Sequence, residues 1–158
     1  MTLGFILNGE DVLVKSDAKK RLVDILRDNF GLLETKSGCN IGQCGACSII
    51  LNGEVVKSCL IPAFKIQGCE IITIEGFAQT DEYQDIVLGF SEAGLENCGF
   101  CSNGKILNIE ALLGKNRNPE QEEILPVFNG VKCRCIEPTE LVQGVLAVAE
   151  FRRRRLYG

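Results

Sequence analysis

The chain contains 158 residues, of which 46% are hydrophobic and 24% are charged, and its formal net charge is −4. This composition is typical of globular proteins and excludes wholesale disorder. The acidic balance argues against a general nucleic-acid binder. Histidine is absent, which excludes nucleophile pairs that need an imidazole base and all histidine-ligated zinc, haem and Rieske sites. The unusual feature is the presence of nine cysteines.

The cysteines are expected to be reduced. Residues Met1–Glu10 contain neither the basic region nor the long apolar stretch of a secretory signal. No apolar run approaches the roughly 18 residues that a membrane span needs. We therefore expect a cytoplasmic protein with no membrane partner. In a reducing compartment, abundant cysteine indicates metal binding or redox work rather than disulfides.

The N-terminal half has the pattern of a mixed structure with several strands and one helix. Strands are expected at residues 2–7, 11–15, 46–51, 54–60 and 70–74. Two Asn-Gly pairs, Asn8-Gly9 and Asn52-Gly53, predict tight hairpin turns. A helix capped by Ser16 or Asp17 is expected to run to about Asn29.

The C-terminal half is expected to be almost entirely helical. Helical periodicity predicts helices at residues 82–93, 103–113, 120–128 and 138–155. Pro126 leaves the end of the third helix open, whereas Pro138 lies where a first-turn proline is tolerated. The short connection Gly76–Asp81 is the expected boundary between two domains, which would cover residues 1–77 and 78–158.

Four cysteines of the first half follow a C-x4-C-x2-C spacing with a later fourth member: Cys39, Cys44, Cys47 and Cys59. This is the plant-type [2Fe–2S] pattern. Three thiolates from one loop must wrap closely around a small cluster, which explains Gly38, Gly42 and Gly45 in the loop. A four-cysteine zinc site is the alternative, but zinc usually uses two well-separated C-x2-C pairs. The spacing therefore favours iron–sulfur.

A second group consists of a C-x2-C pair and a distant C-x-C pair: Cys98, Cys101, Cys133 and Cys135. Both pairs precede predicted helices, whose N-terminal N–H groups favour an anionic group. From spacing alone, these four thiolates could hold either zinc or a [2Fe–2S] cluster.

Together, the loop from Gly38 to Cys47, then Cys59, then Cys98-Gly99-Phe100-Cys101 and Cys133-Arg134-Cys135 resemble the small iron–sulfur subunit of the molybdenum hydroxylases, the xanthine dehydrogenase and aldehyde oxidoreductase family. The resemblance covers essentially the whole chain. It implies an α+β protein with an N-terminal β-grasp, plant-ferredoxin-like domain, followed by an all-α four-helix-bundle domain. It also implies two [2Fe–2S] clusters, one in each domain.

The function implied by the resemblance is electron transfer, without a catalytic site on this chain. In that family, electrons leave a molybdopterin cofactor in a large subunit, pass the cluster of the helical domain and then the ferredoxin-like cluster, and reach FAD in a medium subunit. Carried over, the second cysteine group holds the molybdenum-side cluster and the first group holds the flavin-side cluster. Molybdopterin and FAD are expected on partner subunits.

The sequence departs from the family on the side expected to face the molybdenum subunit. The family usually has a glutamine whose amide contacts the pterin; this chain has Asn97, with the same donors and acceptor on a shorter stem. After the two cysteine pairs, Ser102-Asn103-Gly104 and Ile136-Glu137-Pro138 replace the common Thr-Pro-Gly and Thr-Gly-Tyr. None of these changes removes a ligand, so the sequence indicates a divergent member with Asn97 as a candidate pterin contact.

Two other functions remain open from the sequence. One is a stand-alone ferredoxin-like electron carrier, and the other is a zinc-stabilised, non-redox interaction module. Cys69 fits neither cysteine group and is expected to be a small buried residue. The basic run Arg152–Arg155 is expected to be either a solvated helix end or a docking surface for an acidic partner.

Overall fold

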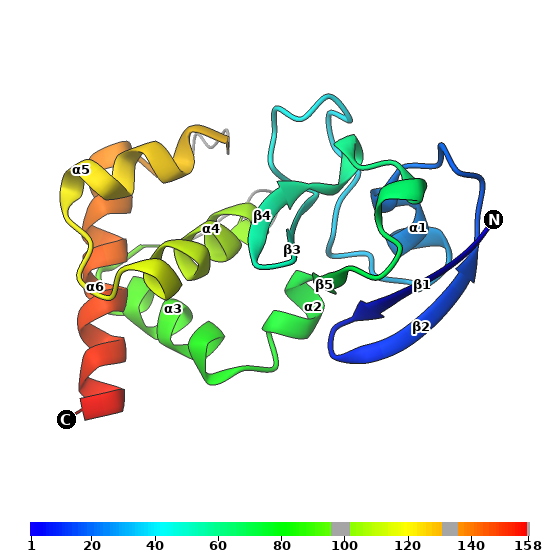
Figure 1. Cartoon of the computed structure of the whole chain (residues 1–158). Coiled ribbons are helices and arrows are strands. Elements are labelled where there is room, and N and C mark those ends of the chain that lie inside the picture. Colours follow the sequence, from blue (N-terminus) through cyan, green and yellow to red (C-terminus); the bar gives the residue numbers. More distant parts are fainter. Residues whose placement is uncertain (96–101, 131–135, 158) are drawn as a thin grey trace.

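The computed structural model describes residues 1–95, 102–130 and 136–157, in which a sheet-containing half is followed by a helical half (Figure 1). The sheet has the strand order β2-β1-β5-β3-β4. Its strands are β1 (Thr2–Leu7), β2 (Glu10–Lys15), β3 (Ser48–Leu51), β4 (Glu54–Lys57) and β5 (Glu70–Ile72). β1 is parallel to β5, and the other neighbouring pairs are antiparallel.

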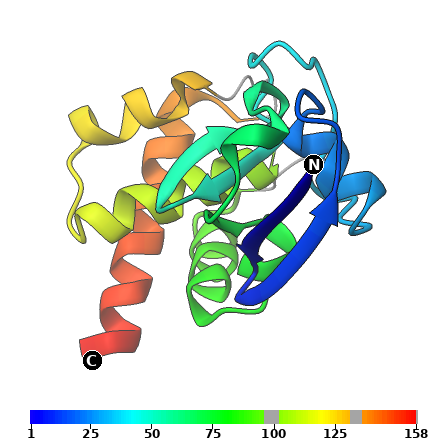
Figure 2. The ribbon, with the colours of Figure 1, turned by 45° about the vertical axis from the view of Figure 1, so that its right-hand side comes forward.

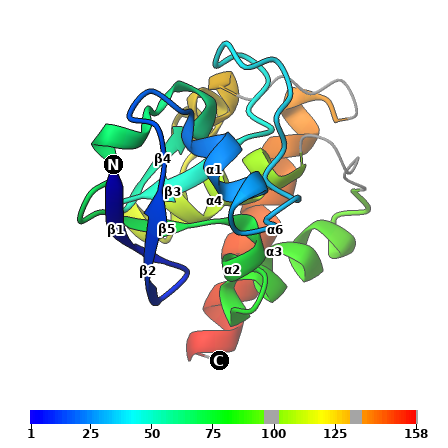
Figure 3. The same cartoon turned by 90° about the vertical axis from the view of Figure 1, so that its right-hand side faces the viewer.

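Helix α1 (Leu22–Asp28) covers one face of this sheet (Figure 3). Its side chains Leu22, Ile25 and Leu26 are fully buried in a core with Phe5 of β1 and Ile49 of β3. A mixed sheet that wraps one helix is the β-grasp arrangement, and with the helices that follow it confirms the expected α+β class.

The two predicted hairpin turns are present. Asn8 and Gly9 have φ values of 51° and 84°, and Asn52 and Gly53 have 49° and 85°. Positive φ at both central residues is the type I′ geometry, whose twist matches that of the flanking strands. The Asn-Gly pairs therefore fix the register of β1 on β2 and of β3 on β4.

The predicted start of the first helix is wrong. Asp17 does not cap a helix; its side chain accepts a hydrogen bond from the Lys19 N–H at 2.8 Å and closes a local turn. Arg21 remains extended and forms a bridge with Pro62, so helical geometry begins only at Leu22.

Three predicted strands are shorter than expected, and the first of them, β3, begins at Ser48 rather than at residue 46. The strand predicted to reach residue 60 ends at Lys57, because Ser58 donates through its N–H and hydroxyl to the Cys47 carbonyl and the chain turns into a 3₁₀ helix over Ser58–Leu60. The strand predicted to reach residue 74 ends at Ile72. Beyond it, α2 (Ile74–Phe77) occupies the start of the expected domain connection.

The helical half contains the described elements α3 (Asp81–Glu92), α4 (Ser102–Lys115), α5 (Gln121–Ile124) and α6 (Pro138–Tyr157). The Thr80 hydroxyl caps α3 by accepting a hydrogen bond from the Tyr83 N–H at 3.3 Å. The helix predicted at residues 120–128 is instead α5 followed by a 3₁₀ helix over Leu125–Gly130. Pro126 lacks the N–H needed to continue the α-helix. No helix in the three described ranges combines the length and hydropathy needed to cross a membrane.

The two halves share an apolar contact, which fixes how the sheet lies relative to the described helices. Ile50, Val55 and Ile72 of the sheet pack against the buried cluster formed by the helices. Helix α4 lies against the β3–β4 hairpin (Figures 1 and 2).

The contact between α3 and α6 depends on the absence of a side chain at Gly89. A Cβ atom there would lie 2.7 Å from the Val148 Cα and 2.9 Å from the Val148 nitrogen. These are backbone atoms, so the helices themselves would have to move apart. We expect Gly89→Ala to destabilise the protein by about 1–3 kcal/mol, which thermal melting of the full chain will measure.

Gly114 supplies the matched control because it also lies in a helix but has no atom within 4 Å of an added Cβ. Gly114→Ala should leave the melting temperature unchanged or raise it, since alanine is favoured over glycine in helices by up to about 1 kcal/mol. Equal melting temperatures for the two variants would contradict this account of the α3–α6 contact.

Candidate metal centre

The first cysteine group lies on an irregular loop that projects beyond the sheet (Figure 1, cyan). Cys39 and Cys44 are partly exposed, Cys47 is buried immediately before β3, and Cys59 is buried in the 3₁₀ turn after β4. The loop is closed at its base by a hydrogen bond from the Lys36 N–H to the Ala46 carbonyl at 3.1 Å. The fold thus brings all four residues of the C-x4-C-x2-C…C pattern to one end of the β3–β4 hairpin.

Backbone N–H groups of the loop point at cysteine sulfur. The Cys39 Sγ accepts from Gln43 at 3.2 Å, from Cys44 at 3.3 Å and from Ile41 at 3.5 Å. The Cys44 Sγ accepts from Ala46 at 3.4 Å. Such a concave array of N–H groups binds anions. It lowers the pKa of Cys39 to about 6, with the Ile41 N–H as the largest cause.

Positive backbone dihedrals make this array possible. Asn40, Gly42 and Gly45 have φ values of 58°, 77° and 75°. At Gly42 an added Cβ would also lie 2.5 Å from Cδ1 of Leu60, so the Leu60 side chain would have to shift. Gly42 and Gly45 therefore have the conformational role that the sequence predicts. The same expectation is wrong for Gly38, whose φ is not positive.

The four cysteines of the first group lie close enough to affect one another's pKa. Cys44 is the cysteine neighbour of Cys39, and Cys47 is the main cysteine neighbour of the buried Cys59, whose pKa Cys39 also raises. Cys47 and Cys59 are buried beside Val23 of α1. Burial of the Cys59 thiol is the largest cause of its raised pKa, and the neighbouring Cys47 thiol adds to the effect. The pKa of Cys59 is raised to about 11.

In the described part of the chain, no group of three or more Cys, His, Asp or Glu side chains is arranged to hold a metal ion. Four neighbouring thiols, with backbone N–H groups directed at Cys39 and Cys44, are the kind of donor set that would hold a [2Fe–2S] cluster.

The second cysteine group and the candidate pterin contact lie outside the described residues. Cys98 and Cys101, together with Asn97, fall in residues 96–101, and Cys133 and Cys135 fall in residues 131–135. The nearest described elements are α4, which begins at Ser102, and α6, which begins at Pro138.

Residues 33–36, which lead into the first cysteine loop, are held by hydrogen bonds to α4 of the helical half and to α2. The Asn103 amide, in the first turn of α4, donates to the Glu34 carbonyl at 2.6 Å. The Glu75 carboxylate of α2 accepts from the Glu34 N–H at 3.0 Å and from the Thr35 hydroxyl at 3.1 Å. Asn103 is only 8% exposed. The Asn103 amide thus forms a hydrogen bond within this chain. The sequence predicts that Ser102-Asn103-Gly104, which differs from the common Thr-Pro-Gly, faces the molybdenum subunit.

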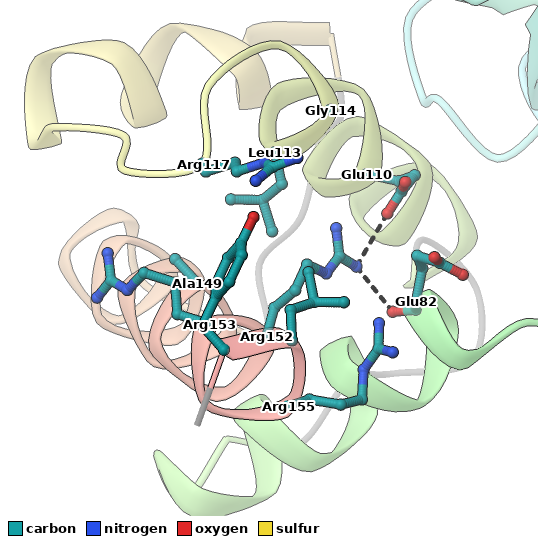
Figure 4. Close-up of a pocket in the computed structure, with 11 residues that line it drawn as sticks. Glu82, Glu110, Leu113, Gly114, Arg117, Ala149, Arg152, Arg153 and Arg155 are labelled. Atoms are coloured by element: carbon teal, nitrogen blue, oxygen red, sulfur yellow. Dashed lines mark hydrogen bonds and ion pairs between the residues drawn. The ribbon is translucent and has the colours of Figure 1, made fainter.

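A cavity of about 190 Å³ lies between α3, α4 and α6, where charged side chains line its wall (Figure 4). Arg152 donates to the Glu82 carbonyl at 2.9 Å and lies 3.0 Å from the Glu110 carboxylate, as an ion pair without hydrogen-bond geometry. Burial raises the pKa of Glu110, and Arg152 opposes that shift. Arg152 and Arg155 also bind the buried Asp85. The basic run is therefore partly internal, because Arg152 and Arg155 form ion pairs that join α6 to α3 and α4.

Cys69 is partly exposed rather than buried, which corrects the expectation from the sequence. Its Sγ lies 3.4 Å from the Lys65 carbonyl oxygen, in the turn before β5.

Comparisons with known proteins match both halves of the chain. Residues 5–70 match a family model described as a 2Fe-2S iron-sulfur cluster binding domain, and residues 73–146 match one described as a [2Fe-2S] binding domain. The small FeS subunit of nicotinate dehydrogenase from Eubacterium barkeri is 42% identical over 85% of this chain and 86% of that protein.

Two solved structures have the same fold. Quinoline 2-oxidoreductase from Pseudomonas putida 86 aligns with a TM-score of 0.84 and 33% identity, over 98% of this chain and 96% of that one. Aldehyde oxidoreductase from Desulfovibrio gigas aligns with a TM-score of 0.86 and 33% identity, over 99% of this chain but 18% of that one. The chain belongs to the small iron–sulfur subunits of the molybdenum hydroxylases, the oxidoreductase family of xanthine dehydrogenase and aldehyde oxidoreductase, and it has the two [2Fe–2S] domains of that family.

Proposed function

We propose that this chain relays electrons between partner subunits, through a ferredoxin-like domain at residues 1–77 and a helical domain at residues 78–158. The first domain holds its cluster through Cys39, Cys44, Cys47 and Cys59, and the second through Cys98, Cys101, Cys133 and Cys135. The observation that carries the proposal is the Cys39 sulfur, which accepts three backbone N–H groups beside the other cysteines of the first group. A [2Fe–2S] cluster supplies one-electron redox chemistry when it is bound.

The loop around the first site provides a surface for a partner. Cys39 and Cys44 are more exposed than Cys47 and Cys59. Next to them, Ile41 is 62% exposed and Leu60 is 57% exposed. Apolar side chains beside a redox site favour the close approach that electron transfer between proteins requires. We call the exposed surface around Ile41 and Leu60 the rim of the first site, and we assign it to the subunit that carries FAD.

The partners in this proposal are a molybdopterin-binding large subunit and an FAD-binding medium subunit. Support comes from the relative that is itself named a small FeS subunit and from an aldehyde oxidoreductase chain of which this protein matches 18%. Asn97 then contacts the pterin of the large subunit. A reducing compartment keeps free thiols available as ligands, which supports a cytoplasmic location.

Purification of the tagged full chain from the cells that produce it tests the proposed partners. We expect two further polypeptides, with molybdenum and FAD, to copurify in fixed ratio, and we expect the chain alone to show no substrate turnover. Recovery of an iron-loaded chain without these subunits, even after mild cross-linking, would support the stand-alone carrier and contradict the proposal.

Ile41→Ser tests the assignment of the rim. Loss of an apolar side chain that becomes buried against a partner should cost about 1–2 kcal/mol of binding free energy, which raises the Kd for the FAD-carrying subunit about fivefold to thirtyfold. The Kd can be measured by calorimetry with both proteins loaded. Leu13→Ser is the matched control, because Leu13 is 77% exposed on β2. An equal Kd for the two variants would place the partner elsewhere.

A further inference from the structure

A lysine side chain reaches into the first cysteine loop from the neighbouring strand. The Nζ of Lys57, the last residue of β4, donates a hydrogen bond to the carbonyl oxygen of Gly42 at 2.6 Å. Gly42 lies between Cys39 and Cys44, fifteen residues earlier in the chain. The contact is partly buried, and its short length is that of a charge-assisted hydrogen bond.

The carbonyl that Lys57 contacts belongs to the same peptide group as the Gln43 N–H. That N–H donates to the Cys39 Sγ at 3.2 Å, the shortest of the three hydrogen bonds to this sulfur. The ammonium therefore acts on one end of a peptide whose other end points at a ligand sulfur. Hydrogen bonds in such a chain polarise one another, so the positive charge strengthens the N–H···S interaction.

The Gly42–Gln43 peptide is held at both of its ends. Its carbonyl accepts from the Lys57 Nζ at 2.6 Å, and its N–H donates to the Cys39 Sγ at 3.2 Å. Gly42 itself has a φ of 77°, a backbone conformation that glycine adopts without strain. A peptide that is bonded at both ends transmits a nearby charge to the sulfur as an electrostatic effect, without a change in loop structure.

We propose that Lys57 is a positioning residue that raises the reduction potential of the first cluster, by polarising the Gly42–Gln43 peptide toward the Cys39 sulfur. This inference rests on the proposed function, because it requires Cys39 to be a cluster ligand. Reduction adds one electron, supplied by the partner subunit or by dithionite, and so adds one negative charge at the sulfurs and irons. A more positive N–H at Cys39 stabilises that charge.

The test is a redox titration of the full chain, followed by electron paramagnetic resonance, for Lys57→Met, Lys57→Gln and Lys57→Arg. Lys57→Met removes both charge and donor and should lower the electron affinity of the first cluster about threefold to tenfold. A tenfold change corresponds to about 59 mV for a one-electron couple. Lys57→Gln keeps a neutral donor and should lie between Met and wild type, and Lys57→Arg should remain near wild type. The second cluster should keep its potential in every variant.

Lys115→Met is the matched control. Lys115 pairs with Glu54 at the opposite end of β4 and is exposed, so its loss removes the same charge away from the loop. A first-cluster potential that is unchanged in Lys57→Met, or that shifts equally in Lys115→Met, would overturn the inference. Loss of the first cluster in both Lys57→Met and Lys57→Gln would also overturn it, in favour of a purely structural contact. Absence of the first cluster from the unsubstituted chain would instead refute the proposed function.

Discussion

Cys59→Ala should lower the iron bound by the reconstituted full chain from about four atoms to about two. Cys59 is 4% exposed and adjoins Cys47, so no water-exposed side chain can replace its sulfur. A cluster that loses one of four thiolates from a buried pair is not retained through anaerobic gel filtration. Iron analysis and the visible absorption spectrum measure the loss, and the signal that disappears from the paramagnetic resonance spectrum identifies the first cluster.

Cys69→Ala is the control for this experiment, since it also removes one thiol from the chain. Cys69 lies in the turn before β5 and contacts the Lys65 carbonyl rather than the cysteine loop. The iron content of the Cys69→Ala variant should therefore equal that of the unsubstituted chain. Equal iron in Cys59→Ala and Cys69→Ala would show that Cys59 is not a ligand.

Asp85→Ala should destabilise the helical half more than the removal of an exposed charge from α3 does. Asp85 is 1% exposed, and its carboxylate accepts hydrogen bonds from Arg152 at 3.1 Å and from Arg155 at 2.7 and 2.8 Å. The hydrogen bond to Asp85 raises the pKa of Arg155. Removal of one partner from a buried ion pair costs about 3 kcal/mol. For a chain of this size, this lowers the melting temperature by about 6–12 °C.

Glu92→Gln tests whether burial is the reason for this effect. Glu92 also joins α3 to α6, through Arg154 at 3.0 Å, but the two side chains are 50% and 57% exposed. An exposed ion pair contributes about 0–1 kcal/mol. Calorimetric melting of both variants should therefore separate them clearly, and similar melting temperatures would contradict the role given to Asp85.

Local chemistry explains the features that the sequence predicted correctly. The hairpins follow from Asn8-Gly9 and Asn52-Gly53, since few residue pairs tolerate positive φ at both positions. The loop around the first cysteine group follows from its glycines, because Gly42 and Gly45 have the positive φ values that close wrapping of the chain requires; the assignment of the four cysteines as ligands stays a prediction. Errors in the helical half are small where a cap or a proline marks a boundary, as Thr80 does for α3.

Contacts between distant parts of the chain explain what the sequence did not predict. Arg155 lies 70 residues after Asp85, and Asn103 lies 69 residues after Glu34. No periodicity or spacing rule links residues so far apart. The late start of α1 has a similar cause, because the extended conformation of Arg21 depends on its bridge to Pro62. Lys57 could have been noticed as a charge two residues before a proposed ligand, but its hydrogen bond to Gly42 depends on the folded hairpin.

Spin quantitation of the fully reduced, reconstituted chain tests the central claim most directly. Two independent [2Fe–2S] centres predict two distinguishable rhombic signals that together integrate to about two spins per polypeptide. A single signal that integrates to one spin after complete reduction would contradict the assignment of eight cysteines to two clusters.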